Sequence, residues 1–317
     1  MPLPLLKSSS RLLMFAPHPD DESLACGILL QNAVQAGASI SVVYVTDGEN
    51  NPWPQRCLSR RWRLNPADRH KWAKLRRQEA LAALRVLGAA SADVRFLGWP
   101  DQGLAGLLLS DRASSLARLR HLIVEWSPTD VVAPDVADRH RDHRALGVML
   151  GLLFSGSGSD LHQIQRWSYI VHGRAPGFLR NARAVPQMRR QAETKRRAIS
   201  CHQSQLMLSR RRFLSYAARS ELLLDIPPQE VAQKDRARAR VMKPPGEARM
   251  AVLHDGMVAW GVSGRRRIRS CWRIVNGVWQ RLARVTRFIG ICRHPAEVAN
   301  SRSAETLSYA SKPWQKQ

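Results

Sequence analysis

A histidine and three acidic residues follow one another closely near the start of the chain. The segment His18-Pro19-Asp20-Asp21-Glu22 comes directly after an apolar run at residues 12–16. Carboxylates and an imidazole packed into one turn repel and desolvate one another unless a cation is present. A bound metal removes this conflict, because it is the largest local charge and favours deprotonated ligands. The turn therefore predicts a cation site, although alone it also fits the solvated start of a helix.

A second group of the same kind lies near the middle of the chain. Asp138, His140, Asp142 and His143 follow an apolar run at residues 130–133. The carboxyl ends of parallel strands face one edge of a sheet, where ligands bind. One histidine and one carboxylate from the first turn, with one histidine from the second, make the two-nitrogen, one-oxygen set of catalytic zinc, which leaves a position open for water. Alone, this second group also fits a surface turn with satisfied hydrogen bonds.

The elements that must position these turns alternate between strand and helix. Short β-rich apolar runs are found at residues 12–16, 40–46, 94–97, 130–133 and 166–171, and helical periodicity at 23–36, 66–87, 111–125 and from 143 onward. Gly37 and Gly88 follow two of the predicted helices, as left-handed caps commonly require. This alternation is typical of a parallel sheet covered by helices. We therefore expect an α/β fold with a mostly parallel sheet and helices on both faces.

Two stretches depart from this alternation. Residues 49–66 are rich in Trp, Arg and Pro, and this loop is long enough to favour a functional role over a plain connection. Residues 226–317 are interrupted by prolines and carry no acidic residue between Asp255 and Glu297. We expect one domain at residues 1–225, followed by a basic C-terminal module whose spacing fits either an amphipathic helix or a β-hairpin.

The charge balance points to an anionic partner. Fifty Lys and Arg against 25 Asp and Glu give a net charge of +25, enough to concentrate anions near the surface. Nucleic acid, an anionic membrane and a phosphorylated substrate all fit this charge, as does a solvated basic surface. No apolar run reaches the roughly 18 residues that cross a bilayer, the start lacks the features of a signal peptide, and the five cysteines form no close pair. We expect a cytoplasmic protein without a disulfide framework.

Together these motifs resemble one protein family, the PIG-L or LmbE-like N-acetylglucosaminyl deacetylases. The matching segments are His18-Pro19-Asp20-Asp21-Glu22, Thr46-Asp47-Gly48-Glu49, Arg77 with Glu79, the run at residues 96–103, His140-Arg141-Asp142-His143, and Lys195, Ala198, His202, Ser204 and Gln205. The resemblance covers residues 11–224, and the paired H-P-D-D-E and H-x-D-H motifs are its most specific part. The sequence departs from the family at Arg141, where a proline is frequent, and in the basic module.

The resemblance implies a Rossmann-like fold and hydrolysis of the acetamide of an N-acetylated amino sugar, free or joined to an anionic or lipid group. It implies a zinc ion held by residues matching His18, Asp21 and His143, with ferrous iron as the alternative metal. Asp20 is then the general base. His140 is the candidate general acid or oxyanion stabiliser, and Asp142 is placed to hold its imidazole.

Substrate contacts are expected from residues near the second strand. Asp47 is expected either to contact a sugar hydroxyl or to cap the next segment. Arg77 is expected either to reach a substrate phosphate or hydroxyl, or to pair on the helix surface. The loop between them offers Trp53, Arg60, Arg61 and Trp62. These are stronger candidates, because aromatic faces stack on sugars and guanidinium groups bind phosphate in a bidentate way; the alternative is a basic loop exposed to solvent.

Two other functions compete with catalysis, and both use the basic module. A nucleic-acid-binding protein fits the net charge, but no zinc finger, RNP or helix-turn-helix signature is found, so we expect no specific nucleic-acid partner. A membrane-surface anchor would place arginines on anionic headgroups and Trp272, Trp279 and Phe288 at the interface. Such peripheral contact with the inner membrane face is compatible with the enzyme and with a lipid-linked sugar as substrate. The sequence predicts no oligomeric state.

Overall fold

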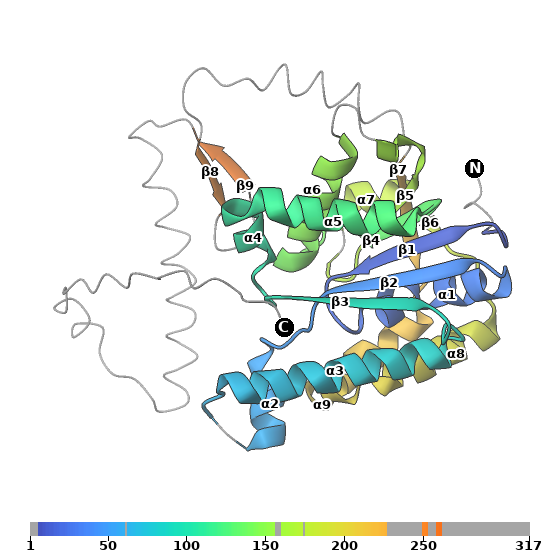
Figure 1. Ribbon diagram of the computed structural model, residues 1–317. Helices are drawn as coiled ribbons and strands as arrows, with labels where there is room; N and C mark the ends of the chain where they lie inside the picture. The colour runs from blue at the N-terminus through green and yellow to red at the C-terminus, as the bar shows by residue number, and fades with distance from the viewer. Residues whose placement is uncertain are drawn as a thin grey trace, which may run out of the picture. The chain divides into compact units, whose positions relative to one another are not determined.

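The computed structural model describes residues 6–60, 62–155, 160–173, 175–226, 249–252 and 258–261. Its main element is a seven-stranded sheet with the order β3-β2-β1-β4-β5-β7-β6 (Figure 1). The strands are β1 (Arg11–Ala16), β2 (Ser39–Thr46), β3 (Asp93–Trp99), β4 (Asp130–Pro134), β5 (Gln165–Tyr169), β6 (Arg183–Ala184) and β7 (Leu222–Ile226). Neighbours from β3 to β5 are parallel, whereas β7 pairs antiparallel with β5 and β6. The predicted mostly parallel sheet is confirmed.

The central strand of the sheet is apolar on both faces. In β1, Leu12, Met14 and Ala16 belong to the hydrophobic core on one side of the sheet, and Leu13 and Phe15 belong to the core on the other side. None of these side chains is more than 1% exposed. A strand covered on both faces by helices needs such a continuous apolar run rather than an alternating pattern. Polar chemistry is therefore confined to the ends of the central strands.

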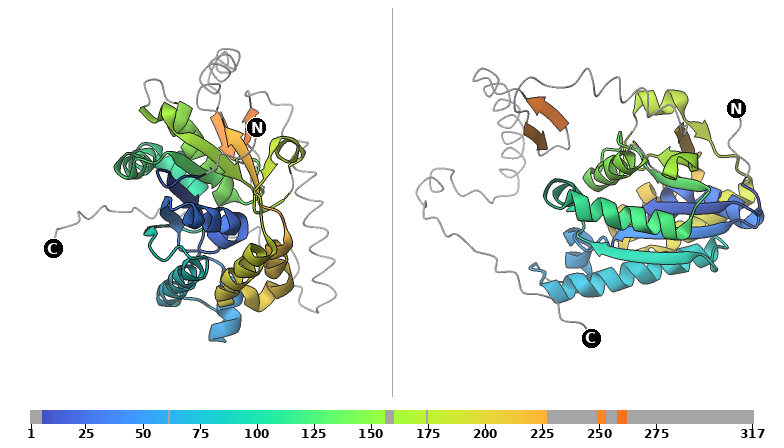
Figure 2. Two further views of the ribbon diagram at one scale, coloured as in Figure 1. Left: turned by 90° about the vertical axis from the view of Figure 1, so that its right-hand side faces the viewer. Right: turned by 45° about the horizontal axis from the view of Figure 1, so that its top comes forward.

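Helices cover both faces of the sheet, as the Figure 1 and Figure 2 views show. One face carries α1 (Asp21–Gln35), α3 (Pro66–Val86) and α8 (Arg189–Cys201), and the other carries α4 (Leu104–Ser110), α5 (Arg112–Trp126) and α6 (Arg141–Ser155). Further elements are α2 (Pro52–Ser59), α7 (Pro176–Asn181), α9 (Gln203–Ser215) and the 3-10 turns η1 (Asp160–Gln163) and η2 (Tyr216–Ala218). The predicted α/β fold class is confirmed.

The segment at residues 49–66 is not a plain loop, because it contains α2. Pro52 lies in the first turn of this helix, where a backbone N–H has no intrahelical partner to lose. The helix ends at Arg60, which adopts the left-handed conformation with a φ of 52°. Gly37 and Gly88 also have positive φ angles, 73° and 85°, as predicted for the ends of α1 and α3. The tryptophans and arginines of this segment are thus presented by a helix and its cap.

Most of the predicted basic module lies outside the described residues. Within residues 226–317 the structure describes a separate two-stranded sheet of β8 (Arg249–Val252) and β9 (Val258–Gly261). The boundary near residue 225 and the alternative of helix or hairpin after Asp255 stay predictions. None of the helices in the described ranges is long and apolar enough to cross a membrane.

Candidate active site

Parallel strand ends bring polar side chains to one edge of the sheet. His18 follows β1, Asp101 follows β3, His143 lies in the first turn of α6 after β4, and His172 follows β5. Because these strands are parallel, their carboxyl ends share an edge. His18 and Asp101 are each 7% exposed, and His143 is fully buried. The two sequence motifs therefore meet, although they are far apart in the chain.

The Asp21 carboxylate lies between two imidazoles. Its Oδ2 atom is 3.3 Å from Nδ1 of His18 and 3.2 Å from Nε2 of His143. Ligand atoms of a tetrahedral zinc site with bonds of about 2.0 Å are about 3.3 Å apart, and each of these two separations matches that value. The backbone N–H of His18 also donates to Oδ2 of Asp21 at 2.9 Å, which fixes the carboxylate in the turn. All predicted ligands are thus brought to one place.

Three groups among the described residues offer ligand atoms that all lie within 4.8 Å of one another. They are His18, His140 with His143; Asp21, His143 with His172; and His18, Asp101 with Asp142. The predicted set of His18, Asp21 and His143 is not one of these groups, although each of its pairs is close. The His18 ring is turned so that Nδ1 faces Asp21, while Nε2 lies 3.3 Å from a carboxylate oxygen of Asp101 and of Asp142.

The surroundings of His143 fit a metal ligand. Both of its ring nitrogens are buried, and neither has a hydrogen-bond partner of acceptable geometry among the described residues. Nδ1 nevertheless faces Oδ2 of Asp138 at 3.3 Å, on the side away from Asp21. A ligating histidine commonly directs its second nitrogen at a carboxylate in this way. Asp138 is itself held by the backbone N–H groups of His140, at 2.8 Å, and His172, at 3.0 Å.

The electrostatics of the cluster also favour a cation. Burial lowers the pKa of His18, but contacts with Asp101, Asp142 and Asp21 raise it well above its usual value. Burial likewise lowers the pKa of His143, but the charge of Asp21 and the contact with Asp138 raise it to about 9. Protonated imidazoles would thus balance the charge of the carboxylates when no metal is bound. Since metal binding releases such protons, a divalent cation would satisfy the same carboxylates.

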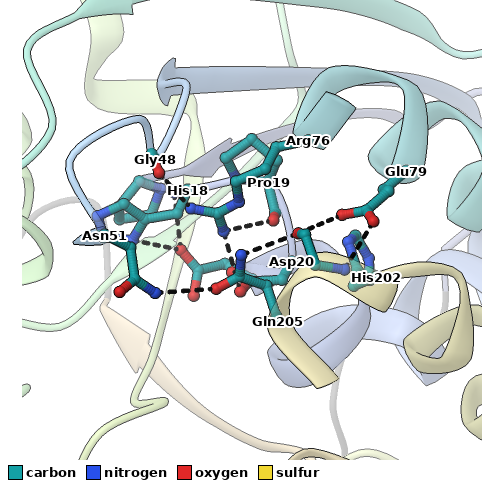
Figure 3. Close-up of polar contacts among 12 residues, drawn as sticks. His18, Pro19, Asp20, Gly48, Asn51, Arg76, Glu79, His202 and Gln205 are labelled. Carbon is teal, nitrogen blue, oxygen red and sulfur yellow. Dashed lines mark hydrogen bonds and ion pairs between the residues drawn. The ribbon is translucent and has the colours of Figure 1, made fainter. Parts of the chain in front are cut away.

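Asp20 is buried next to this cluster and is held by an arginine of α3. Figure 3 shows the Arg76 guanidinium between Asp20 and two backbone carbonyls. Its Nη2 donates to Oδ2 of Asp20 at 3.1 Å and to the Pro19 carbonyl at 2.7 Å, and its Nη1 donates to the Gly48 carbonyl at 3.0 Å. Burial raises the pKa of Asp20 to about 6, and the charge of Arg76 opposes this shift. Asp20 is therefore an ionised, fixed carboxylate near neutral pH.

His140 and Asp142 contact each other differently from the sequence prediction. We expected the Asp142 carboxylate to hold the His140 imidazole. Instead this carboxylate accepts the backbone N–H groups of Gln102, at 2.7 Å, and Leu104, at 3.2 Å, and faces His18. The difference arises because the residues after β3 supply free N–H groups that a buried carboxylate needs. The backbone N–H of Asp142 donates to Nδ1 of His140 at 3.3 Å, so the proton of a neutral His140 ring is on Nε2.

The pKa of His140 is low. Burial and the nearby charges of His18, His143 and His172 lower it to about 3. The imidazole is accordingly neutral, and its ring lies 4.7 Å from that of His18 between centroids. A neutral ring with a proton on Nε2 is a hydrogen-bond donor, which suits stabilisation of a developing oxyanion.

The predicted substrate-binding residues lie on the outer side of this site. Arg77 Nε and Nη2 donate to the two carboxylate oxygens of Asp47 at 2.8 and 2.6 Å, so these two residues pair with each other. Trp53 is 56% exposed on α2. Arg60 is exposed at the end of α2. Arg61 lies outside the described residues. None of the described residues among them belongs to the groups of candidate ligands around His18 and His143.

Two adjoining cavities open at the site. The first, of about 280 Å³, is lined by His18, Asp20, Arg76, Asp101, Gln102 and His140 together with Leu24, Asn51, His172, Gln205 and Phe213. The second, of about 310 Å³, shares these last residues and adds Trp53, Pro54, Ser209, Arg212 and Tyr216. Because they share lining residues, the cavities are adjacent, with the histidines and carboxylates beside the first and aromatic side chains beside the second.

Comparison with known sequences finds similarity to one family. Residues 13–151 match the family model PIG-L, described as GlcNAc-PI de-N-acetylase. Over this range, which is less than half of its length, the chain is similar to the PIG-L family. The family is one of metal-dependent deacetylases, and Asp20, the predicted ligands and His140 all lie inside the matched range. The second cavity is built largely from α9 and η2, which lie beyond that range.

Relatives and solved structures agree with this assignment. A 1D-myo-inositol 2-acetamido-2-deoxy-alpha-D-glucopyranoside deacetylase from Corynebacterium efficiens is 29% identical over 182 residues, 53% of this chain and 55% of the relative. The chain spans about half the length of the curated relatives it matches. A conserved protein from Thermus thermophilus is similar over 69% of this chain and 95% of its own, with 25% identity and a TM-score of 0.51. N,N'-diacetylchitobiose deacetylase from Pyrococcus horikoshii shares the fold over 69% and 85%, with 20% identity and a TM-score of 0.53.

The sequence analysis did not assign site roles to Arg76, Asp101 and His172, which line the first cavity. His18 was selected because polar residues directly after a parallel strand face the edge of the sheet where ligands bind. The same reasoning would have selected Asp101, after β3, and His172, after β5. The helical spacing of the sequence could have identified Arg76. It shares the spacing of the buried residues Trp72, Ala73, Ala80, Ala83 and Leu84, which places it on the buried face of α3.

Proposed function

We propose that the chain is a metal-dependent hydrolase that removes the acetyl group from an N-acetylated amino sugar. The observation that carries the proposal is a buried carboxylate, Asp20, fixed beside an imidazole and carboxylate cluster that fits a metal. His18, Asp21 and His143 would hold the ion. Two nitrogens and one oxygen favour zinc, with ferrous iron as the alternative. The names of the similar proteins, deacetylases of amino-sugar compounds, support the substrate class.

A bound zinc ion would lower the pKa of a coordinated water from about 15.7 toward about 7 and polarise the acetamide carbonyl. The protein's own residues do the rest. Asp20 accepts the proton of the attacking water, and Arg76 keeps the carboxylate aimed and ionised. His140 donates its Nε2 proton as a hydrogen bond to the carbonyl oxygen while negative charge develops there. Asp20 then returns the proton to the nitrogen as the carbon–nitrogen bond breaks, which leaves acetate and a free amine.

The second cavity favours a substrate that is larger than the amino sugar alone. Trp53, Phe213 and Tyr216 offer aromatic faces, on which a second ring can stack. Arg212 is exposed at this cavity, and no carboxylate lies within ion-pair distance of it in the described part of the chain. A guanidinium without an acidic neighbour suits an anionic group on the second unit. We infer that the substrate is a conjugate of the amino sugar. Its acetamide would lie at the proposed metal site, and its second unit would lie along α9.

A deacetylation screen tests the proposed function. The purified full-length chain, loaded with Zn²⁺ or Fe²⁺, is given free N-acetylglucosamine and its inositol-linked, malate-linked and lipid-linked conjugates, and released acetate is measured. We expect acetate from at least one conjugate, loss of activity with a chelator and recovery when metal is restored. Failure to release acetate from any of these compounds, by a folded and metal-loaded protein, would contradict the proposal. Full activity after exhaustive chelation would remove the metal from it.

A matched pair of variants tests the role of the second cavity. Arg212→Gln should raise KM for an anionic conjugate and leave free N-acetylglucosamine unaffected, whereas Arg211→Gln, an exposed neighbour on α9 that does not line the cavity, should change neither. Loss of one charge-assisted contact corresponds to about a 10- to 100-fold effect. Equal behaviour of the two variants would exclude Arg212 from substrate binding.

A further inference from the structure

Large apolar side chains gather on the exposed side of α2 and the turn after it. Trp53 and Leu58 are each 56% exposed, and Trp62 is 71% exposed. We call these residues, together with Arg56, Arg60 and Arg63, the α2 rim. Scattered exposed apolar residues are normal, but large ones this close together commonly mark a contact surface.

The α2 rim is built around one arginine. The Arg56 guanidinium carbon lies 5.1 Å from the centre of the Trp53 ring and 4.7 Å from that of Trp62. The two indole rings are 6.1 Å apart and roughly perpendicular. Arg56 Nε also donates to the Trp62 carbonyl at 3.0 Å, which closes the turn back onto the helix. The indoles are therefore displayed on a fixed scaffold rather than on a loose loop.

The charge of this segment has one sign. Arg56, Arg60, Arg61 and Arg63 fall between Glu49 and Asp68, and the sequence has no acidic residue in that interval. A surface that carries both indoles and several arginines matches the interfacial region of an anionic membrane, where each of these side chains is favoured.

The α2 rim stands at the mouth of the active site. Trp53 lines the second cavity, and Asn51, directly before α2, lines both cavities. Asn51 also donates to Gln205 of α9 at 3.3 Å, which ties the start of α2 to the cavity wall. Figure 1 and Figure 2 show α2 beside α9 and the beginning of α3. A surface that the rim contacts would therefore face the cavity opening.

We propose that the α2 rim attaches the protein to the surface of an anionic lipid bilayer and so presents the active-site mouth to the headgroups. The contact is peripheral, with indoles at the level of the headgroups and arginines on lipid phosphates. An acidic protein partner would match the arginines as well. The projecting indoles favour a bilayer, because the interfacial region accepts them without a shaped counterpart.

Vesicle sedimentation of the full-length chain tests this proposal without any use of catalysis. Vesicles of equal phosphatidylglycerol and phosphatidylcholine are compared with phosphatidylcholine alone. Arg60→Gln with Arg63→Gln should lower partition onto the anionic vesicles about 30-fold. Arg112→Gln with Arg118→Gln removes the same charge from exposed positions of α5 and should lower it far less. Equal losses in the two double variants would overturn the proposal, because they would show attraction by net charge alone.

Tryptophan fluorescence adds a test of the indoles. Lipids brominated on the acyl chains quench only indoles that enter the interface, so wild-type fluorescence should fall on binding. Trp53→Ala with Trp62→Ala should bind less and lose most of this quenching, whereas Leu109→Ala with Val124→Ala, at exposed apolar positions of α4 and α5, should behave as wild type. Unchanged quenching in the tryptophan variant, or no vesicle binding by the wild type, would rule out the α2 rim as a membrane surface. None of these readouts depends on the deacetylase proposal, so either can fail alone.

Discussion

Two arginine–aspartate pairs stand side by side on α3, and they differ in almost every physical respect. The inner pair joins Arg76, 3% exposed, to Asp20, and its guanidinium also binds two backbone carbonyls. The outer pair joins Arg77 to Asp47 in a bidentate contact, with the Arg77 side chain 39% exposed. Arg76 thus contacts the segment after β1, and Arg77 contacts the segment after the neighbouring strand β2. Of the two pairs, only the inner one lines the cavity that His18 and Asp101 also line.

We infer that the role of each ion pair depends on its burial more than on its hydrogen-bond geometry. The outer pair has the better hydrogen bonds, but its Arg77 side chain is partly exposed, so water screens the pair although Asp47 is only 8% exposed. The inner pair has one longer contact, but Asp20 cannot be solvated if Arg76 is removed. We therefore expect the inner pair to control catalysis and stability together, and the outer pair to affect each only slightly. The following predictions are ordered by the size of the expected effect.

The largest effect is expected at the acids of the two pairs. Asp20→Asn removes the proposed base and should lower kcat about 100- to 10,000-fold. Asp47→Asn, the matched change in the outer pair, should lower kcat less than tenfold. Acetate release under saturating substrate measures both. A fall in kcat for Asp47→Asn as large as that for Asp20→Asn would contradict the distinction between the pairs. It would indicate that the carboxylate at the end of β2 also takes part in catalysis.

The arginines should differ in stability and in pH dependence. Arg76→Met leaves Asp20 buried without its partner and should destabilise the fold by about 3–5 kcal/mol, measured by chemical denaturation. Arg76 also lowers the pKa of Asp20, which burial raises to about 6. Asp20 acts in its ionised form, so activity falls as the pH drops through its pKa. Removing Arg76 should therefore move the acid limb of kcat/KM to higher pH.

That shift in the acid limb separates electrostatic positioning from a general loss of structure. Combining the change with Asp20→Asn, which also removes the buried charge, should recover part of the lost stability. An unchanged acid limb in Arg76→Met, or strict additivity in the double variant, would argue that Arg76 supports only the fold.

A glycine connects the inner pair to β2. Gly48 has a φ of +63°, and a Cβ at this position would overlap the Arg76 guanidinium. Gly48→Ala should therefore displace Arg76 and destabilise the fold by more than about 1 kcal/mol. Gly98 offers a control, because it has the same φ, and a Cβ there would stay 3.6 Å or more from its neighbours. Similar activity losses in Gly48→Ala and Gly98→Ala would show that backbone strain, and not Arg76, explains the effect.

The smallest effect is expected at the arginine of the outer pair. Arg77→Met should change the free energy of unfolding by about 1 kcal/mol or less, because the side chain is partly exposed and the pair is screened. If the side chain also contacts substrate, KM should rise with kcat unchanged. A stability loss comparable with that of Arg76→Met would show that exposure is a poor guide to the energy of these pairs.

The sequence predicts the fold and the meeting of the two motifs well, and the direction of side chains less well. Alternating apolar runs establish β1 and β4, and strand order then brings Asp21 and His143 together. The predicted contact between Asp142 and His140 was wrong, because a buried carboxylate turns to whichever N–H groups the tertiary fold leaves free. The helix α2 was expected to be a loop, since a short segment rich in Pro, Trp and Arg has no apolar period. Arg76 was overlooked in favour of Arg77, although the buried spacing of α3 distinguishes them.

Metal content measured together with turnover tests the central claim most directly. Wild type, Asp20→Asn and His143→Ala are purified in parallel, and each is assayed for bound metal per chain and for acetate release. The account predicts one ion in the active wild type, one ion with little turnover in Asp20→Asn, and neither ion nor turnover in His143→Ala. Equal loss of metal from both variants, or an active wild type that binds no metal, would contradict it.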